Sequence, residues 1–118
     1  MVTAFHVCEH LGAGKLLAVI DEITRVLRPR GLVIIETLNP ENLFVATRAA
    51  VENPTRRLLL DPELAEFLLK HRGFELIKTM RLRKPSRKTK LPKNGSTSQF
   101  INEHFFAARD YNVIARKG

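Results

Sequence analysis

The amino-acid sequence predicts an α/β fold: part of a doubly wound three-layer sandwich with a mostly parallel sheet. Residues 32–37, LVIIET, place four apolar residues in a row without alternation, which indicates a strand buried on both faces. Residues 2–5 form a shorter apolar run, and a helical pattern over residues 15–27 separates the two runs. Strand, helix and strand in this order predict a right-handed βαβ unit. A last strand at 111–115, YNVIA, is expected to be antiparallel.

The helices are predicted from apolar spacing and from the residues at their ends. The helix over 15–27 has apolar residues at helical spacing, and Pro29 follows its end. A second helix is expected over residues 41–51. A third begins at Asp61, an N-cap followed by proline, and Gly73 is placed to cap its C-terminus. A strand over 74–82 and a short helix over 97–106 complete the predicted elements.

The size and composition predict one cytoplasmic domain. The chain has 118 residues with 44% apolar residues, which is ordinary for a globular protein. The one cysteine, Cys8, rules out an internal disulfide and suits a reducing compartment. No apolar run approaches the length of a membrane span, and no secretion signal is recognisable at the N-terminus.

The positive charge is concentrated in one segment. The formal net charge is +8, but residues 81–93 hold seven Lys or Arg and no acid, which leaves 13 basic and 12 acidic residues elsewhere. We therefore expect a basic flexible loop at 81–96. It is either a solvated loop or a contact for an anionic surface or nucleic acid. The lack of aromatic residues within this run disfavours recognition of single-stranded nucleic acid.

Two short motifs suggest chemistry that their surroundings exclude. His6, Glu9 and His10 have the spacing of an inverted zinc-protease motif, but such ligands sit on a helix, and Gly12 and Gly14 leave barely one helical turn. The run GAGK at 12–15 lacks the hydroxyl residue and the earlier glycine of a phosphate-binding loop. No metal site is predicted.

Longer stretches resemble a known family. The runs VTAFHVCEHL and EITRVLRPRGLVIIETLNPEN are similar to the second half of class I S-adenosylmethionine-dependent methyltransferases, which have a Rossmann-like fold. The later runs NPTRRLLLDPELAEFLLKHRGFE and NEHFFAARDYNVIARKG resemble the family's helix before its sixth strand and its terminal hairpin strand. The resemblance spans nearly the whole chain and implies methyl transfer from S-adenosylmethionine.

The resemblance also implies site residues. Thr3, Ala4, Phe5 and His6 would lie along the cofactor, because ligands of open α/β sheets bind beyond the carboxyl ends of the strands. Glu9 and His10 would be catalytic, orienting an acceptor hydroxyl and taking its proton. Asn39 would contact the substrate. The alternative for both histidines is that they are satisfied polar groups at a strand–helix junction, and for Asn39 that it makes the turn before Pro40. Some relatives bind a divalent metal through Glu-x-x-Glu-His, where this chain has His6 in place of the first Glu.

The sequence departs from the family in ways that limit the expected activity. Arg30 stands where the family usually has glycine, and the family's glycine-rich turn and ribose-binding acid are absent, so residues 1–118 are expected to be a partial methyltransferase domain. We expect no catalysis by the isolated chain unless the missing half-site is supplied. A narrower resemblance, to bacterial methyltransferases of cell-surface polysaccharide pathways, implies a saccharide or other small-molecule acceptor. The alternative function is an inactive remnant that self-associates through its exposed sheet edge.

Overall fold

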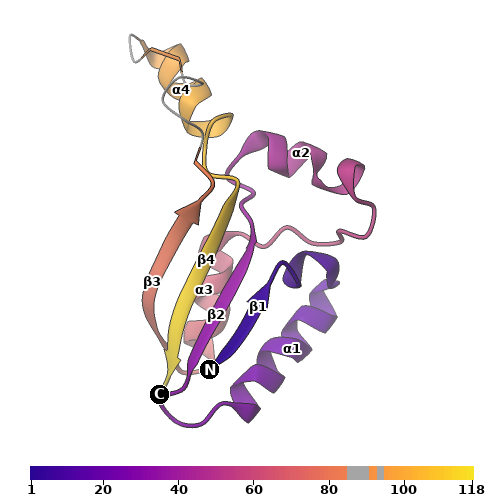
Figure 1. Ribbon diagram of the computed structural model, residues 1–118, viewed down its shortest axis with the longest axis vertical. Helices are drawn as coiled ribbons and strands as arrows, with labels where there is room; N and C mark the ends of the chain where they lie inside the picture. Colours follow the sequence, from indigo (N-terminus) through magenta and orange to yellow (C-terminus); the bar gives the residue numbers. More distant parts are fainter. Residues whose placement is uncertain (85–90, 93–94) are drawn as a thin grey trace.

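The secondary structure follows the predicted order. The computed structural model describes residues 1–84, 91–92 and 95–118 of the chain (Figure 1). The strands are β1 (Val2–Phe5), β2 (Leu32–Leu38), β3 (Phe74–Leu82) and β4 (Asp110–Lys117). The helices are the 3₁₀ turn η1 (Cys8–His10), α1 (Ala13–Val26), α2 (Leu43–Glu52), α3 (Pro62–His71) and α4 (Ser96–His104). Each predicted strand and helix is present, with ends shifted by at most two residues.

The four strands form one mixed sheet in the order β1-β2-β4-β3. β1 and β2 pair in parallel, and β4 pairs antiparallel with both β2 and β3. Three strands therefore run in one direction and the C-terminal strand runs against them, which confirms the predicted partial α/β fold. Because β4 lies between β2 and β3, only the β1–β2 pairing is itself parallel.

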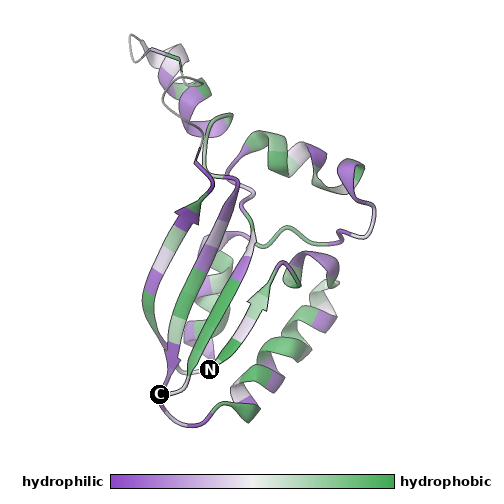
Figure 2. Cartoon of the chain, in the orientation of Figure 1, coloured by the Kyte–Doolittle hydropathy of each residue, from purple (hydrophilic) through white to green (hydrophobic). Residues whose placement is uncertain are grey.

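Helices α1 and α3 pack on the same face of the sheet. Residues of alternate positions in each strand point to this face and join α1 and α3 in the main core, for example Ile20, Ile35, Leu69 and Val113. In Figure 1, α3 lies behind the strands. Figure 2 shows the apolar residues concentrated along the strands and along the helix sides that meet them.

The opposite face of the sheet carries no helix among the described residues. The register places Phe5 beside Glu36, and Glu36 beside Asn112, on this face. Phe5 is 53% exposed, and Ile34 and Ile114 are only half-buried. Of the three layers of a complete sandwich, the described residues thus form a helix layer and a sheet.

Two turns have left-handed backbone conformations. Gly73 has φ of 84°, the left-handed conformation that ends α3. Arg30 has φ of 67°, so the position where the family has glycine does require a positive φ. The Arg30 amide donates to the carbonyl of Lys117 at 2.9 Å, which holds this strained turn against the end of β4.

The predicted basic loop at 81–96 is only partly described. Arg81 and Leu82 belong to β3, and α4 begins at Ser96, whereas residues 85–90 and 93–94 lie outside the described residues. Within the described part of the chain, no helix has the length and apolar character needed to cross a membrane.

Candidate functional site

The carboxyl ends of β1, β2 and β3 meet at one edge of the sheet, where most of the predicted site residues lie. The chain leaves β1 at His6, which has φ of 54°. Its amide donates to the carbonyl of Glu36 in β2 at 2.8 Å. A left-handed conformation is unfavourable for a residue with a Cβ, and such strain often occurs at binding sites.

His6 lies between two carboxylates. Its Nδ1 is 2.8 Å from Oε1 of Glu9, and its Nε2 is 3.2 Å from Oε2 of Glu36. An imidazole protonated on both nitrogens would donate a hydrogen bond to each carboxylate. The His6 side chain is 39% exposed, whereas that of Glu9 is 2% exposed. We call His6, Glu9 and Glu36 the His6 cluster. His6 is its most exposed member, and the hydrogen bond to the buried Glu9 fixes the orientation of the His6 ring.

Glu9 also anchors the segment that links α2 to α3, which we call the strap and define as residues 53–60. The Glu9 carbonyl accepts hydrogen bonds from the amides of Arg57 at 2.7 Å and Leu58 at 3.2 Å. Its Oε2 lies 3.4 Å from Nε of Arg56, an ion pair whose two atoms have no hydrogen bond to any described residue. The two atoms are thus close enough for charge attraction, but the N–H group is too poorly aligned with the oxygen for a hydrogen bond.

His10 contacts the strap. Its Nδ1 lies 2.9 Å from the hydroxyl of Thr55, and that hydroxyl donates to Oδ1 of Asn53 at 2.7 Å. The Thr55 oxygen can therefore only accept from His10, which places a proton on Nδ1; in the neutral ring, Nε2 is then the acceptor. The two predicted residues thus have different surroundings: Glu9 is buried against His6 and Arg56, whereas His10 is exposed and contacts Thr55.

The residues predicted to line the cofactor alternate along β1. Thr3 and Phe5 are exposed and point to the helix-free face, whereas Ala4 is 8% exposed and belongs to the core. Ala4 could thus meet a ligand at this edge through its backbone, and Thr3 and Phe5 through their side chains.

Asn39, the predicted substrate residue, is buried and makes local hydrogen bonds. Its Nδ2 donates to the carbonyl of Ala108 at 2.9 Å, and its Oδ1 accepts from the amide of Glu41 at 3.2 Å. Its own amide donates to the carbonyl of Arg109 at 2.8 Å. These bonds tie the end of β2 to the start of β4, and Asn39 also lines a cavity beside them.

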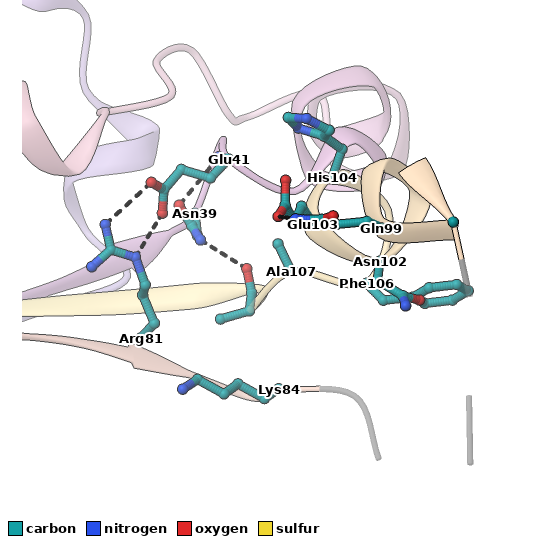
Figure 3. Close-up of a pocket in the computed structure, with 12 residues that line it drawn as sticks. Asn39, Glu41, Arg81, Lys84, Gln99, Asn102, Glu103, His104, Phe106 and Ala107 are labelled. Carbon is teal, nitrogen blue, oxygen red and sulfur yellow. Dashed lines mark hydrogen bonds and ion pairs between the residues drawn. The ribbon is translucent and has the colours of Figure 1, made fainter. Parts of the chain in front are cut away.

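That cavity was not predicted from the sequence. It has a volume of about 930 Å³ and lies between the ends of β2 and β3 and helix α4 (Figure 3). Arg81 crosses it to Glu41 with two bonds, Nε to Oε1 at 2.8 Å and Nη2 to Oε2 at 3.1 Å. Hydrogen bonding from Arg81 lowers the pKa of the Glu41 carboxyl. The position of Glu41 just after β2 could have marked it as a candidate, but its pairing with Arg81 depends on the strand order.

A further ion pair lies between the His6 cluster and the cavity. Arg83 bonds to the buried Asp110 at the start of β4, with Nη2 at 2.9 Å from Oδ1. Hydrogen bonding to Asp110 raises the pKa of Arg83, and the charges of Glu36 and Glu9 raise it further. Polar groups thus follow the carboxyl edge of the sheet from β1 to β3. In the described part of the chain, no group of three or more His, Cys, Asp or Glu residues is placed to hold a metal ion.

Comparisons with known proteins support the fold. No protein-family model matches the sequence, and no curated protein matches it. Solved structures do match. A SAM-dependent methyltransferase from Archaeoglobus fulgidus is 24% identical with a TM-score of 0.85, over 98% of this chain and 57% of that one.

Two further solved structures match this chain with lower sequence identity and lower TM-scores. One is a complex of the Haloferax volcanii Trm112 methyltransferase activator with a protein described as a methyltransferase. It is 11% identical with a TM-score of 0.64, over 97% of this chain and 51% of that one. The other is the [4+2]-cyclase SpnF, 15% identical with a TM-score of 0.56, over 98% of this chain and 48% of that one. The chain therefore has the fold of SAM-dependent methyltransferases and spans about half the length of the structures it matches.

Proposed function

We propose that the chain is part of a methyltransferase domain that transfers a methyl group from S-adenosylmethionine to a small polar acceptor, of which a saccharide is the class implied by the sequence resemblance. The observation that carries this proposal is the carboxyl edge of the parallel pair β1–β2, where the strained His6 and its carboxylates lie. This is where open α/β sheets bind their ligands. The cyclase with the same fold shows that the fold alone does not set the reaction.

The residues at this edge fit one half of a cofactor site. Thr3 and Phe5 offer exposed side chains, and Glu36, which pairs with Phe5 across the two strands, places a carboxylate beside them, which suits a sulfonium cation. The glycine-rich turn and the ribose-binding acid implied by the resemblance are not among the 118 residues. Other polypeptide would have to supply them, so turnover by these residues alone is not expected.

The chain's own residues would act by positioning and by proton transfer. When bound, S-adenosylmethionine supplies the electrophilic methyl group. Glu9 and the strap hold His6 at the edge where the cofactor would lie, and alignment of this kind accounts for most of the catalysis of such a transfer. His10, whose Nδ1 is engaged by the Thr55 hydroxyl, is the group proposed to take the proton of the acceptor hydroxyl through Nε2 of its neutral ring.

A calorimetric titration of the purified chain with S-adenosylhomocysteine tests the proposed cofactor edge. We expect saturable binding that is weaker than micromolar, because half of the contacts are absent. Phe5→Ala should weaken it several-fold, whereas Phe67→Ala, which removes an equally exposed phenylalanine from α3, should leave it unchanged. A folded chain that gives no saturable heat, or equal losses in the two variants, would contradict the proposal.

Self-association is a second candidate function, favoured by the helix-free face of the sheet. This face exposes Phe5 and half-exposes Ile34 and Ile114. Apolar surface of this kind commonly marks an interface. Sedimentation equilibrium over a range of concentrations would show a mass that rises with concentration and that Phe5→Lys keeps at the monomer value. A monomer at every concentration would exclude this function.

A further inference from the structure

Hydrogen bonds from asparagine side chains hold the walls of the cavity beside α4. Asn39 joins the end of β2 to Ala108, and Asn42 donates from Nδ2 to the carbonyl of Ala107 at 2.8 Å. On the far side, the Asn102 side chain pairs with the backbone of Leu91, with both hydrogen bonds at 2.8 Å. Asparagine side chains thus hold three separate segments around the space, so little ordering would be needed when a ligand enters.

The volume and lining of the cavity suit a small polar ligand. About 930 Å³ is within the range of roughly 300–1,000 Å³ that small-molecule sites occupy. Phe106 and two alanines, Ala107 and Ala108, supply apolar surface, and the remaining lining side chains are polar or charged (Figure 3). Most of those polar groups already have a protein partner. Recognition of a ligand would therefore depend on the groups that still have capacity to form an ion pair or hydrogen bond.

One lining cation and one lining carboxylate have capacity left. Arg81 is neutralised by Glu41, whereas Lys84 has no ion-pair or hydrogen-bond partner among the described residues. Glu103 accepts one hydrogen bond, from Nε2 of Gln99 at 3.0 Å, although a carboxylate can accept about four. Figure 3 shows Lys84 on the strand side of the cavity and Glu103 on the helix side.

We infer that this cavity binds a small hydroxyl-bearing ligand that carries one carboxylate or phosphate group. Lys84 would pair with the anionic group, and Glu103 would accept hydrogen bonds from hydroxyls at the other end of the ligand. An ammonium without a partner among the described residues and a carboxylate with free acceptor capacity both line this cavity, which favours a ligand that has both features over a neutral or purely anionic one. The inference rests on the proposed function only in taking this ligand as the methyl acceptor, because the cavity shares the carboxyl edge with His6.

Binding can be measured without the cofactor. Backbone amide NMR signals of the full chain would be followed during titration with D-glucuronate, D-glucose 6-phosphate and D-glucose. We expect one or both anionic sugars to shift signals of the cavity residues between Gln99 and Ala108, and glucose to bind at least several-fold more weakly. The comparison of the two anionic sugars distinguishes a carboxylate from a phosphate as the preferred group.

Three variants make the test specific. Lys84→Gln should weaken the binding of the anionic sugar roughly 3- to 10-fold, the net range for one ordinary hydrogen bond, because the Lys84 ammonium is exposed to solvent. Glu103→Gln should weaken the binding of all sugars that bind. Lys70→Gln removes the same charge from the exposed end of α3, outside the cavity, and should change nothing. Because Lys84 and Lys70 are both exposed, neither variant is expected to affect folding.

Any of the following results would overturn the inference. No shift with any sugar would mean that the cavity does not take this class of ligand. Equal binding of glucose and the anionic sugars, or equal losses in Lys84→Gln and Lys70→Gln, would mean that Lys84 does not select an anion. Because S-adenosylhomocysteine is absent from this titration, failure of the cofactor edge would leave its outcome unchanged, and the reverse also holds.

Discussion

Glu9 is expected to stabilise the fold far more than an exposed glutamate does. The Glu9→Ala variant removes a carboxylate that is 2% exposed, together with its hydrogen bond to His6 and its ion pair with Arg56. Breaking a buried charge pair by removing one partner costs about 3–5 kcal/mol. Arg56 is 23% exposed and keeps a bond from Nη1 to the carbonyl of Ala49 at 3.2 Å, so we expect the lower end, about 3 kcal/mol.

Urea denaturation followed by circular dichroism measures this loss. With an m-value of about 1.5 kcal/mol/M, a loss of about 3 kcal/mol lowers the urea midpoint by about 2 M. Glu9→Gln keeps an oxygen that can accept from His6 but loses the charge facing Arg56, so its midpoint should fall by about half as much. Glu75→Gln, on an exposed position of β3, is the matched control and should leave the midpoint unchanged.

One result would refute the stabilising role of the Glu9 carboxylate. Midpoints for Glu9→Ala and Glu9→Gln that match that of Glu75→Gln would show that the Glu9 carboxylate does not anchor His6 and Arg56. Glu9 would then be free to act directly on an acceptor, as the sequence resemblance implies.

The remaining predictions concern a buried phenol, a strained turn and the cavity ion pair. Tyr111→Phe removes the hydroxyl that donates to the Leu60 carbonyl at 2.5 Å in a fully buried site, so it should cost about 1–2 kcal/mol in urea denaturation. Arg30→Gly should raise the free energy of unfolding by about 0.5 kcal/mol, because relief of a positive φ outweighs the added chain entropy, whereas Arg28→Gly, where φ is not positive, should lower it. The lowered pKa of Glu41 means that its stabilising contribution is present above the ordinary carboxyl pKa of 4.5 and is lost as pH falls through the lower folded-state value. Urea midpoints measured at neutral and acidic pH should therefore fall further in the parent chain than in Glu41→Gln; equal falls would contradict this assignment.

The elements of the fold could be predicted because their signals are local. Strand β2 is marked by its own uninterrupted apolar run. Helix α3 is marked by its N-cap Asp61, whose side chain accepts from the Glu63 amide at 3.0 Å, only two residues away. The sheet order was not predicted, because the insertion of β4 between β2 and β3 depends on contacts between residues far apart in the sequence. That order decides which pairings are parallel.

The candidate site could be predicted only in part for the same reason. The spacing of His6 and Glu9 keeps them near each other, and the structure joins them directly. Glu36 could have been added, since it ends the strand that pairs in parallel with β1, opposite Phe5. Arg56 could not, because nothing in the sequence shows that the strap folds back over η1.

The cavity lay beyond sequence reasoning because its charges pair across distant segments. Arg81 belongs to a run of basic residues that the sequence presents as one patch, yet its charge is neutralised by Glu41. A count of charges along the chain therefore overstates the free positive charge near the end of β3. Only the fold shows that Lys84 lines a cavity without a partner among the described residues.

The most direct test of the account is to map where S-adenosylhomocysteine binds on the folded chain. Backbone amide signals would be assigned and followed during titration with this compound. The account predicts that the signals of Thr3 to His6 and of Glu36 in β2 shift progressively, while those of α4 stay in place. Absence of any shift at Thr3 to His6, or shifts confined to α4, would contradict the claim that the carboxyl edge of β1 and β2 is half of a cofactor site.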